Sequence, residues 1–192
     1  MSSLLEESHE VQPTASSSTF NPSPIQSYQW RKSICNVDTE LLIQTFDDRI
    51  LVIVTQNGKV GCLTQASLPA HIPLLPPPQP SSTNGHSDNL HILEILPIPP
   101  PSIKLTNLLG KSPNETLYDL YINQISTLIF WALEISSQPR RNVVVGLSLK
   151  KRESLSSHTI DEEDEGDILD DYERERYAGI MELVSQWSGP EE

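Results

Sequence analysis

The chain has 192 residues, 36% of them hydrophobic, and a formal net charge of −13 from 26 acidic and 13 basic residues. An acidic chain lacks the basic footprint that nucleic acids and anionic membrane surfaces require, so neither is an expected partner. No apolar run reaches the roughly 18 residues that span a bilayer, and two cysteines fit buried thiols in a reducing compartment. The expected location is the cytoplasm, with access to the nucleus.

Residues 1–29 are rich in Ser and Pro and are expected to be a disordered tail. A single domain over 30–187 and a short tail over 188–192 follow. Two segments inside the domain are expected to be disordered. The first is a Pro-rich insertion at 68–101, which holds ten of the sixteen prolines and also fits a polyproline II ligand. The second is an acidic loop at 153–166, which begins with hydroxyl residues that are candidates for acid-directed phosphorylation: Ser154, Ser156, Ser157 and Thr159.

Four strands in meander order are predicted for the first part of the domain. Residues 33–39 and 40–46 form the first two, and a turn at Asp47 and Asp48 leads to the third. The stretch 50–64 then reads as a hairpin, with two β-rich runs on either side of Asn57-Gly58. Asn-Gly favours a type I′ turn, which needs positive φ at both central residues. The first run of this hairpin is apolar throughout, so its strand is expected to be buried on both faces or covered by a partner.

The second part of the domain adds a strand at 102–109, a long helix from an N-cap at Ser112 to about Ser136, a Val-rich strand at 142–149 and an amphipathic helix at 167–187. The predicted fold class is therefore α+β, with an antiparallel sheet of about six strands and two helices on one face. Because the central strands are apolar throughout, the other face also needs a cover, and a partner subunit supplies one. The domain is expected to dimerise.

The sequence contains no pattern that indicates catalysis. The sequence has no nucleotide-binding glycine loop, zinc-protease motif or nucleophile elbow, and the five histidines fall in loop-like segments without cysteines at metal-ligand spacing. Cys62 lies in a predicted strand without an activating base, which indicates a core residue. We expect no catalytic residue, no metal site and no cofactor.

The stretch 50–64 resembles the proteasome assembly chaperone 3 family. That family has a strand of the form I-L-V-V-V-T-Q, a two-residue turn and a strand of the form K-x-G-x-L; here these are residues 50–56, the Asn57-Gly58 turn, and Lys59, Gly61 and Leu63. The Lys-Leu-Thr-Asn-Leu-Leu-Gly stretch at 104–110 is similar to another strand of the family. A long helix, a Val-rich strand and a terminal helix ending near Trp187 then follow in the family's order.

The resemblance implies a non-catalytic chaperone for assembly of the proteasome alpha ring. Such a protein would dimerise with a second small assembly chaperone or with itself, and bind an alpha-type subunit transiently. The predicted turn is the expected contact edge for this partner, with Gln56, Asn57, Gly58 and Lys59 as its residues. The alternative is a longin-like or roadblock-like scaffold in trafficking or signalling. The long N-terminus and both insertions depart from the family's pattern and leave open the partner surfaces that they border.

Overall fold

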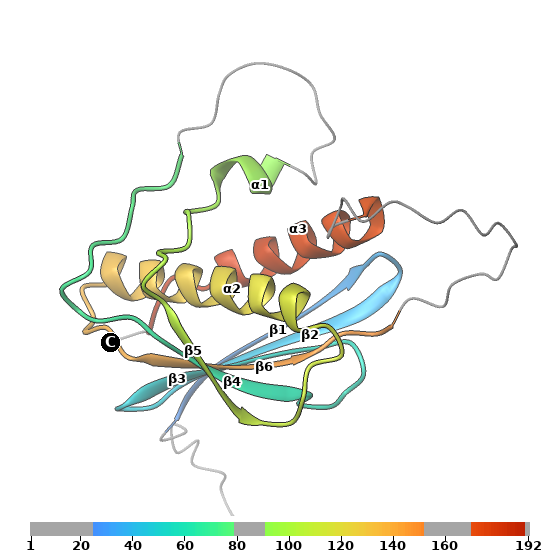
Figure 1. Cartoon of the computed structure of the whole chain (residues 1–192), viewed down its shortest axis with the longest axis horizontal. Coiled ribbons are helices and arrows are strands. Elements are labelled where there is room, and N and C mark those ends of the chain that lie inside the picture. Colours follow the sequence, from blue (N-terminus) through green and yellow to red (C-terminus); the bar gives the residue numbers. More distant parts are fainter. Residues whose placement is uncertain (1–24, 79–90, 152–169, 191–192) are drawn as a thin grey trace, which may run out of the picture.

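A computed structural model describes residues 25–78, 91–151 and 170–190 (Figure 1). Six strands form one sheet, and three helices lie on one side of it. In chain order the elements are β1 (Gln26–Ile34), β2 (Val37–Thr45), β3 (Arg49–Thr55), β4 (Cys62–Ser67), α1 (His91–Ile95), β5 (Lys104–Leu109), α2 (Glu115–Ile135), β6 (Asn142–Ser148) and α3 (Asp171–Ser185). The fold class is α+β, as predicted, but the sheet is mixed and a short third helix is present.

The strand order is β1-β2-β3-β6-β4-β5, which overturns the predicted hairpin at 50–64. β3 and β4 do not pair with each other. β6 lies between them, parallel to β3 and antiparallel to β4. The composition of β6 favours this place, because its Val-rich sequence suits a strand with a neighbour on each side, and six of its seven residues are buried there. A central position in the sheet provides both neighbours, and an edge does not.

The segment that joins β3 to β4 crosses the end of β6 instead of making a tight turn. Gly58 has positive φ and Asn57 does not, so no type I′ turn forms there. At Gly61, φ is +71° and a Cβ atom would lie 2.0 Å from the Leu147 carbonyl oxygen of β6. Only glycine fits this close crossing, so Gly61 is the residue that lets β6 enter between the two strands.

The type I′ turn of this protein lies between β1 and β2. Cys35 and Asn36 have φ of 50° and 61°, and Ile34 pairs directly with Val37 across the two-residue loop. The predicted strand at 33–39 is therefore wrong, because the chain reverses in its middle. β1 instead begins at Gln26, so residues 26–29 belong to the sheet and not to the predicted N-terminal tail. They pair with the last residues of the apolar strand β2, where Gln26 lies opposite Thr45.

The core lies between the sheet and helices α2 and α3, which cover the same face (Figure 1). Alternate strand residues point into it, among them Leu41, Ile43, Val52, Val54 and Val145. α2 ends where it was predicted to end but begins later, because its N-cap is Asn114, whose side chain accepts a hydrogen bond from the Leu117 N–H (3.1 Å). Ser112 lies too far before the first helical residue to fill that role.

The flanks of the Pro-rich insertion pack against the domain. Leu68 and Leu74 are buried, α1 forms within the insertion, and the Gln124 side chain donates a hydrogen bond to the Pro97 carbonyl (2.9 Å). Disorder over the whole of 68–101 is therefore wrong, because its apolar residues contribute to the core. Residues 79–90 and the acidic loop at 153–166 lie outside the described residues. In the C-terminal tail, Gly189 is buried close to Ser136.

Candidate functional site: the open face of the sheet

The face of the sheet opposite α2 and α3, here called the open face, is covered by no helix or strand among the described residues (Figure 1). Cross-strand pairing aligns one residue from each strand in a row across this face. From β1 to β5 the row is Gln29, Leu42, Ile53, Gly146, Leu63 and Leu109. Four of these residues are leucine or isoleucine, so an apolar band runs across the middle of the open face.

The centre of this band is continuous. A Cβ atom at Gly146 would lie 2.6 Å from Ile53 Cδ1 and 3.1 Å from both Leu63 Cδ2 and Val60 Cγ1. The side chains of Ile53, Leu63 and Val60 therefore converge over the bare backbone of Gly146 and fill the space that a larger residue would occupy. The missing side chain at Gly146 joins β3 and β4 into one apolar surface, although the two strands are not neighbours.

Leu51 and Val144 extend the band along β3 and β6. Val144 is buried, Leu51 and Ile53 are half-buried, and Leu109 is 64% exposed at the edge of the sheet. Contiguous apolar area on a protein surface usually marks a place where another molecule binds. A partner that covers these side chains would gain about 25 cal/mol of free energy for each Å² of apolar surface that it removes from water.

Polar residues border the apolar band at both ends of the strands. At one end, Arg31 of β1 forms an ion pair with Glu40 of β2, with 3.5 Å between Arg31 Nε and Glu40 Oε1. Glu40 is in turn aligned with Thr55 of β3. At the other end, Arg49 is aligned with Asn142. An apolar centre within a polar rim is the usual composition of a protein–protein interface.

The open face is not flat. A depression of about 450 Å³ lies over β1, β2 and β3, where Leu42 and Ile53 form its apolar part and Gln29, Arg31 and Glu40 its polar side. The opposite edge of the same face carries the exposed Leu109, and Val60, which lies over Gly146 nearer the centre, is exposed as well. The face thus offers a hollow at one edge and projecting apolar side chains at the other.

The four residues predicted as a contact edge lie in the loop between β3 and β4, next to the open face. Asn57, Gly58 and Lys59 are exposed. The Thr55 hydroxyl accepts hydrogen bonds from the backbone N–H groups of Asn57 (3.2 Å) and Lys59 (3.1 Å), which fixes the loop. Gln56 is different, because its side chain is used inside the molecule and is half-buried.

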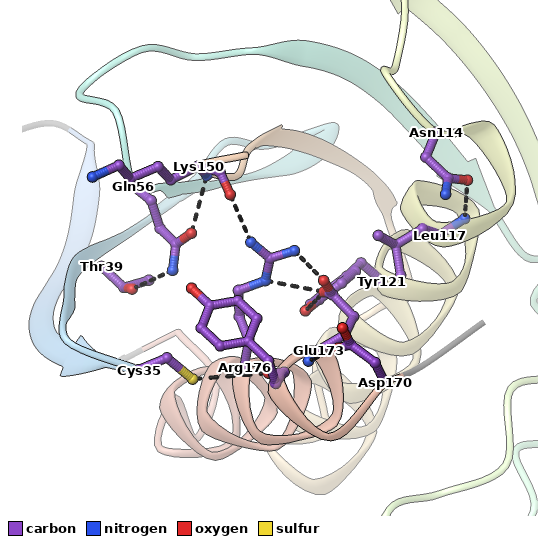
Figure 2. A network of polar contacts seen from close by, with 11 residues as sticks. Cys35, Thr39, Gln56, Asn114, Leu117, Tyr121, Lys150, Asp170, Glu173 and Arg176 are labelled. Carbon is purple, nitrogen blue, oxygen red and sulfur yellow. Dashed lines mark hydrogen bonds and ion pairs between the residues drawn. The ribbon is translucent and has the colours of Figure 1, made fainter. Parts of the chain in front are cut away.

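Figure 2 shows how Gln56 is connected to the helices. Its amide donates to the Thr39 hydroxyl (3.0 Å) and accepts from the backbone N–H of Lys150 (3.1 Å). The carbonyl of Lys150 in turn accepts a hydrogen bond from the Arg176 guanidinium of α3 (2.8 Å). A continuous polar chain therefore links β2, the loop after β3, the end of β6 and α3.

The far end of this chain is a buried cluster of Tyr121, Glu173 and Arg176 (Figure 2). The Glu173 carboxylate accepts hydrogen bonds from the Tyr121 hydroxyl (2.7 Å) and from Arg176 Nε (3.0 Å), and forms an ion pair with the same guanidinium. Burial is the largest single effect and would lower the pKa of Arg176, but the hydrogen bond to Glu173 and the interactions with Tyr121 and the Glu173 charge together raise it. This cluster holds the start of α3 against α2, and it is not among the sites predicted from the sequence.

The surroundings of both cysteines disfavour the thiolate form. The Cys62 thiol is buried beside the Leu147 carbonyl (3.8 Å), and burial raises its pKa, so the reactive thiolate is disfavoured. Burial, followed by the charge of Glu175, also raises the pKa of Cys35. Within residues 25–78, 91–151 and 170–190, no group of three or more His, Cys, Asp and Glu is placed to hold a metal ion. In the same ranges, no helix is long and apolar enough to cross a membrane.

Comparison with known proteins gives little further identification. No family model matches the sequence, and no curated protein matches it. Among solved structures, a chain from a chaperone complex for yeast 20S proteasome assembly is similar, with 13% sequence identity and a TM-score of 0.44 over 85% of this chain and 98% of that chain. Membership of the assembly chaperone 3 family stays a prediction from the sequence.

Proposed function

We propose that this protein is a non-catalytic chaperone that promotes assembly of the proteasome alpha ring. It dimerises through the open face, with a second small chaperone or a second copy of itself, and binds an alpha-type subunit transiently. The observation that carries the proposal is the apolar band across an uncovered sheet, which runs through Leu42, Ile53, Leu63 and Leu109 inside a polar rim.

The choice of the proteasome rests on the sequence resemblance at 50–64. The structure gives those residues coherent roles. Ile53 and Leu63 form the centre of the open face, and Gly61 allows the crossing of β6. The stretch that resembles the family is therefore the same stretch that builds the proposed interface. This agreement supports a dimerising chaperone over a protein that merely shares a few strand residues.

A second surface is needed for the alpha-type subunit if the open face holds the dimer partner. The exposed residues Asn57, Gly58 and Lys59 are the proposed contact. They lie at the border of the open face on a loop fixed by Thr55, so little conformational entropy is lost when a partner binds. The proposed location is the cytoplasm with access to the nucleus.

Affinity capture of the tagged, full-length protein from native extract tests the proposal. Mass spectrometry should identify alpha-type proteasome subunits and a small partner chaperone, or show capture of an untagged second copy. Recovery of trafficking or motor proteins instead would favour the longin-like or roadblock-like scaffold, and recovery of no alpha-type subunit where a known assembly chaperone captures them would refute the proposal.

Two variants on one strand sharpen this test. Leu63→Asp places a charge in the apolar band, whereas Ser67→Asp places the same charge on β4 four residues further on, on the same face but in the polar rim. The first variant should lose the partner chaperone from the captured material and the second should keep it. Equal recovery by both variants would show that the open face is not the dimer interface.

A further inference from the structure

The Pro-rich insertion holds the same short pattern twice, an aliphatic residue followed by three prolines. The first copy is Leu-Pro-Pro-Pro at residues 75–78, and the second is Ile-Pro-Pro-Pro at residues 98–101. The first lies in the flank that leaves β4, the second lies in the flank that leads to β5, and the structure describes both. The two copies have different surroundings, so they can be compared directly.

Proline dictates the backbone of both copies. Its ring fixes φ near about −65°, and a residue that precedes a proline is restricted to extended or polyproline II backbone. Residues 75–77 and 98–100 all precede a proline, so each copy forms about one turn of a polyproline II helix. Such a run is rigid before it meets a partner, so little conformational entropy is lost when it binds.

The second copy is packed into the domain. Pro97 and Pro100 are buried, and because a polyproline II helix has about three residues per turn, both lie on the same side of it. The Gln124 side chain of α2 donates a hydrogen bond to the Pro97 carbonyl (2.9 Å), and the Pro100 carbonyl accepts one from the Ile103 N–H (3.1 Å). The domain itself is therefore the binding partner of this copy.

The first copy is exposed along its whole length. Leu74 directly before it is buried, but residues 75–78 are all exposed, and the apolar Leu75 is 52% exposed. Among residues 25–78, 91–151 and 170–190, none donates a hydrogen bond to a carbonyl of residues 75–78. The apolar surface and the backbone acceptors that the second copy uses within the domain are thus available to another protein in the first.

Arg140 holds the base of the first copy against the domain. Its guanidinium donates hydrogen bonds to the carbonyls of Pro69 (2.9 Å) and Ile72 (2.7 Å), and it pairs with Glu134 near the end of α2 (3.1 Å). The segment after β4 therefore passes the C-terminal end of α2 (Figure 1). Residues 75–78 are presented from this fixed point.

We infer that residues 75–78 bind a groove lined with Tyr and Trp side chains on a partner protein. Grooves of this kind receive the apolar side chains of a polyproline II ligand between aromatic rings. The phenol and indole groups of such a groove can donate hydrogen bonds to the ligand's carbonyls. Leu75 supplies an aliphatic side chain at the start of the run, and the three prolines supply the preformed helix.

Charge narrows the kind of groove. No Lys or Arg occurs between Lys59 and Lys104, and Arg140 is engaged within the molecule. The chain as a whole carries a net charge of −13. A groove with an acidic pocket for a basic residue beside the prolines would find no such residue here and would be repelled, so the partner groove is neutral or basic. This binding does not depend on the proposed chaperone function, because the insertion departs from the family's pattern.

Calorimetric titration of the full-length protein with a panel of purified WW, EVH1 and SH3 domains tests the inference. At least one domain with a neutral or basic aromatic groove should bind saturably, and soluble oligoproline should compete with the full-length protein for it. No saturable binding by any domain of the panel would overturn the inference. Binding that oligoproline does not reduce would also overturn it.

The second copy of the pattern provides a matched control. Leu75→Asp and Ile98→Asp place the same charge on the exposed aliphatic residue of each copy. Leu75→Asp should weaken binding of the domain by at least about tenfold, since a charge then enters an apolar groove. Ile98→Asp should leave binding unchanged. An equal loss for both variants, or a loss for Ile98→Asp alone, would show that residues 75–78 are not the ligand.

A further variant separates the shape of the run from its apolar character. Pro76→Ala combined with Pro77→Ala keeps the run apolar but frees its backbone, which should weaken binding by about four- to thirtyfold. Unchanged binding would show that the domain does not recognise polyproline II structure. All variants should unfold at the temperature of the native protein, because the altered residues are exposed. Leu75→Asp should still capture alpha-type subunits, so this inference and the proposed function can fail separately.

Discussion

The side-chain oxygen of Gln56 accepts a hydrogen bond from the backbone N–H of Lys150, at 3.1 Å, and this contact joins two parts of the chain that are far apart in sequence. Gln56 follows β3, and Lys150 follows β6. Because the Lys150 carbonyl binds Arg176, the contact also connects the loop beside the open face to the buried cluster between α2 and α3.

Replacement of Gln56 by Leu should destabilise the fold although the residue is only half-buried. The substitution leaves the Lys150 N–H and the Thr39 hydroxyl without their partner, at an expected cost of about 1–3 kcal/mol. Urea denaturation measures the loss. Asn57→Ser is the matched control. The exposed Asn57 side chain makes only a long hydrogen bond to Ser148 (3.4 Å), and loss of this bond should cost under about 0.5 kcal/mol. Equal costs for the two variants would mean that the Gln56 contacts are weak.

The buried pair of Glu173 and Arg176 should show strong coupling. Glu173→Leu leaves the guanidinium buried without its carboxylate, and we expect a loss of about 3–5 kcal/mol. The double variant Glu173→Leu with Arg176→Met removes both charges and should recover much of that loss. A double-mutant cycle by chemical denaturation provides the measurement. Additive losses would contradict a direct interaction.

Two neighbouring residues of β3 should respond differently to the same charge. Val54 is fully buried against the helices, so Val54→Asp should cost several kcal/mol and unfold a large fraction of the protein. Ile53 points to the open face, so Ile53→Asp should keep the fold and prevent association. Circular dichroism measures the first effect and light scattering the second. A dimeric Ile53→Asp variant would place the interface elsewhere.

Two glycines in one loop form a similar pair. Gly58 has positive φ but open space around it, so Gly58→Ala should cost about 1 kcal/mol for the left-handed backbone alone. Gly61→Ala adds a clash with the Leu147 carbonyl oxygen and should cost clearly more, because β6 must move. Thermal unfolding of both variants in one buffer tests this order, and the reverse order would refute the crossing as described.

Alkaline pH should unfold the protein through its buried tyrosines. Burial raises the pKa of Tyr121, its hydrogen bond to Glu173 adds to the shift, and burial also raises the pKa of Tyr177. The unfolded chain ionises near pH 10, so the stability from these two groups is complete below that pH and is lost as pH rises above it. Phenolate absorbance at these two residues should appear together with loss of circular dichroism. Ionisation before unfolding would show that they are not buried.

The sequence predicted the parts of the fold that depend on neighbours in the chain. α2 and α3 follow from apolar spacing, although their N-caps are Asn114 and Asp170 and neither was predicted, and the turn at Asp47 and Asp48 forms as expected, with the Phe46 N–H bound to the Arg49 carbonyl (2.9 Å). The pairing of β3 could not be predicted this way. Asn57-Gly58 is a strong local signal for a hairpin, but β6 gains more from pairing on both sides than the hairpin gains from its turn.

The open face was predicted in outline and not in detail. Uniform apolarity of β3 indicated that both of its faces need cover, yet only the register with β2 and β6 assigns Val52 to the core and Ile53 to the open face. Glu173 and Arg176 carried a weaker signal, an acid and a base three residues apart on a helix. Such pairs are common on solvent-exposed helices, so nothing local marked this one as buried.

The central place of β6 has a consequence for how this protein is made. β1, β2 and β3 are synthesised first, but β3 has an unpaired edge until residue 148 has left the ribosome, and β4 and β5 have no bond to the other strands without β6. A nascent or truncated chain that ends before β6 therefore holds two separate strand groups with open edges, which favours aggregation. Folding has to await residues 142–148, and a premature stop before residue 142 should yield no native-like fragment.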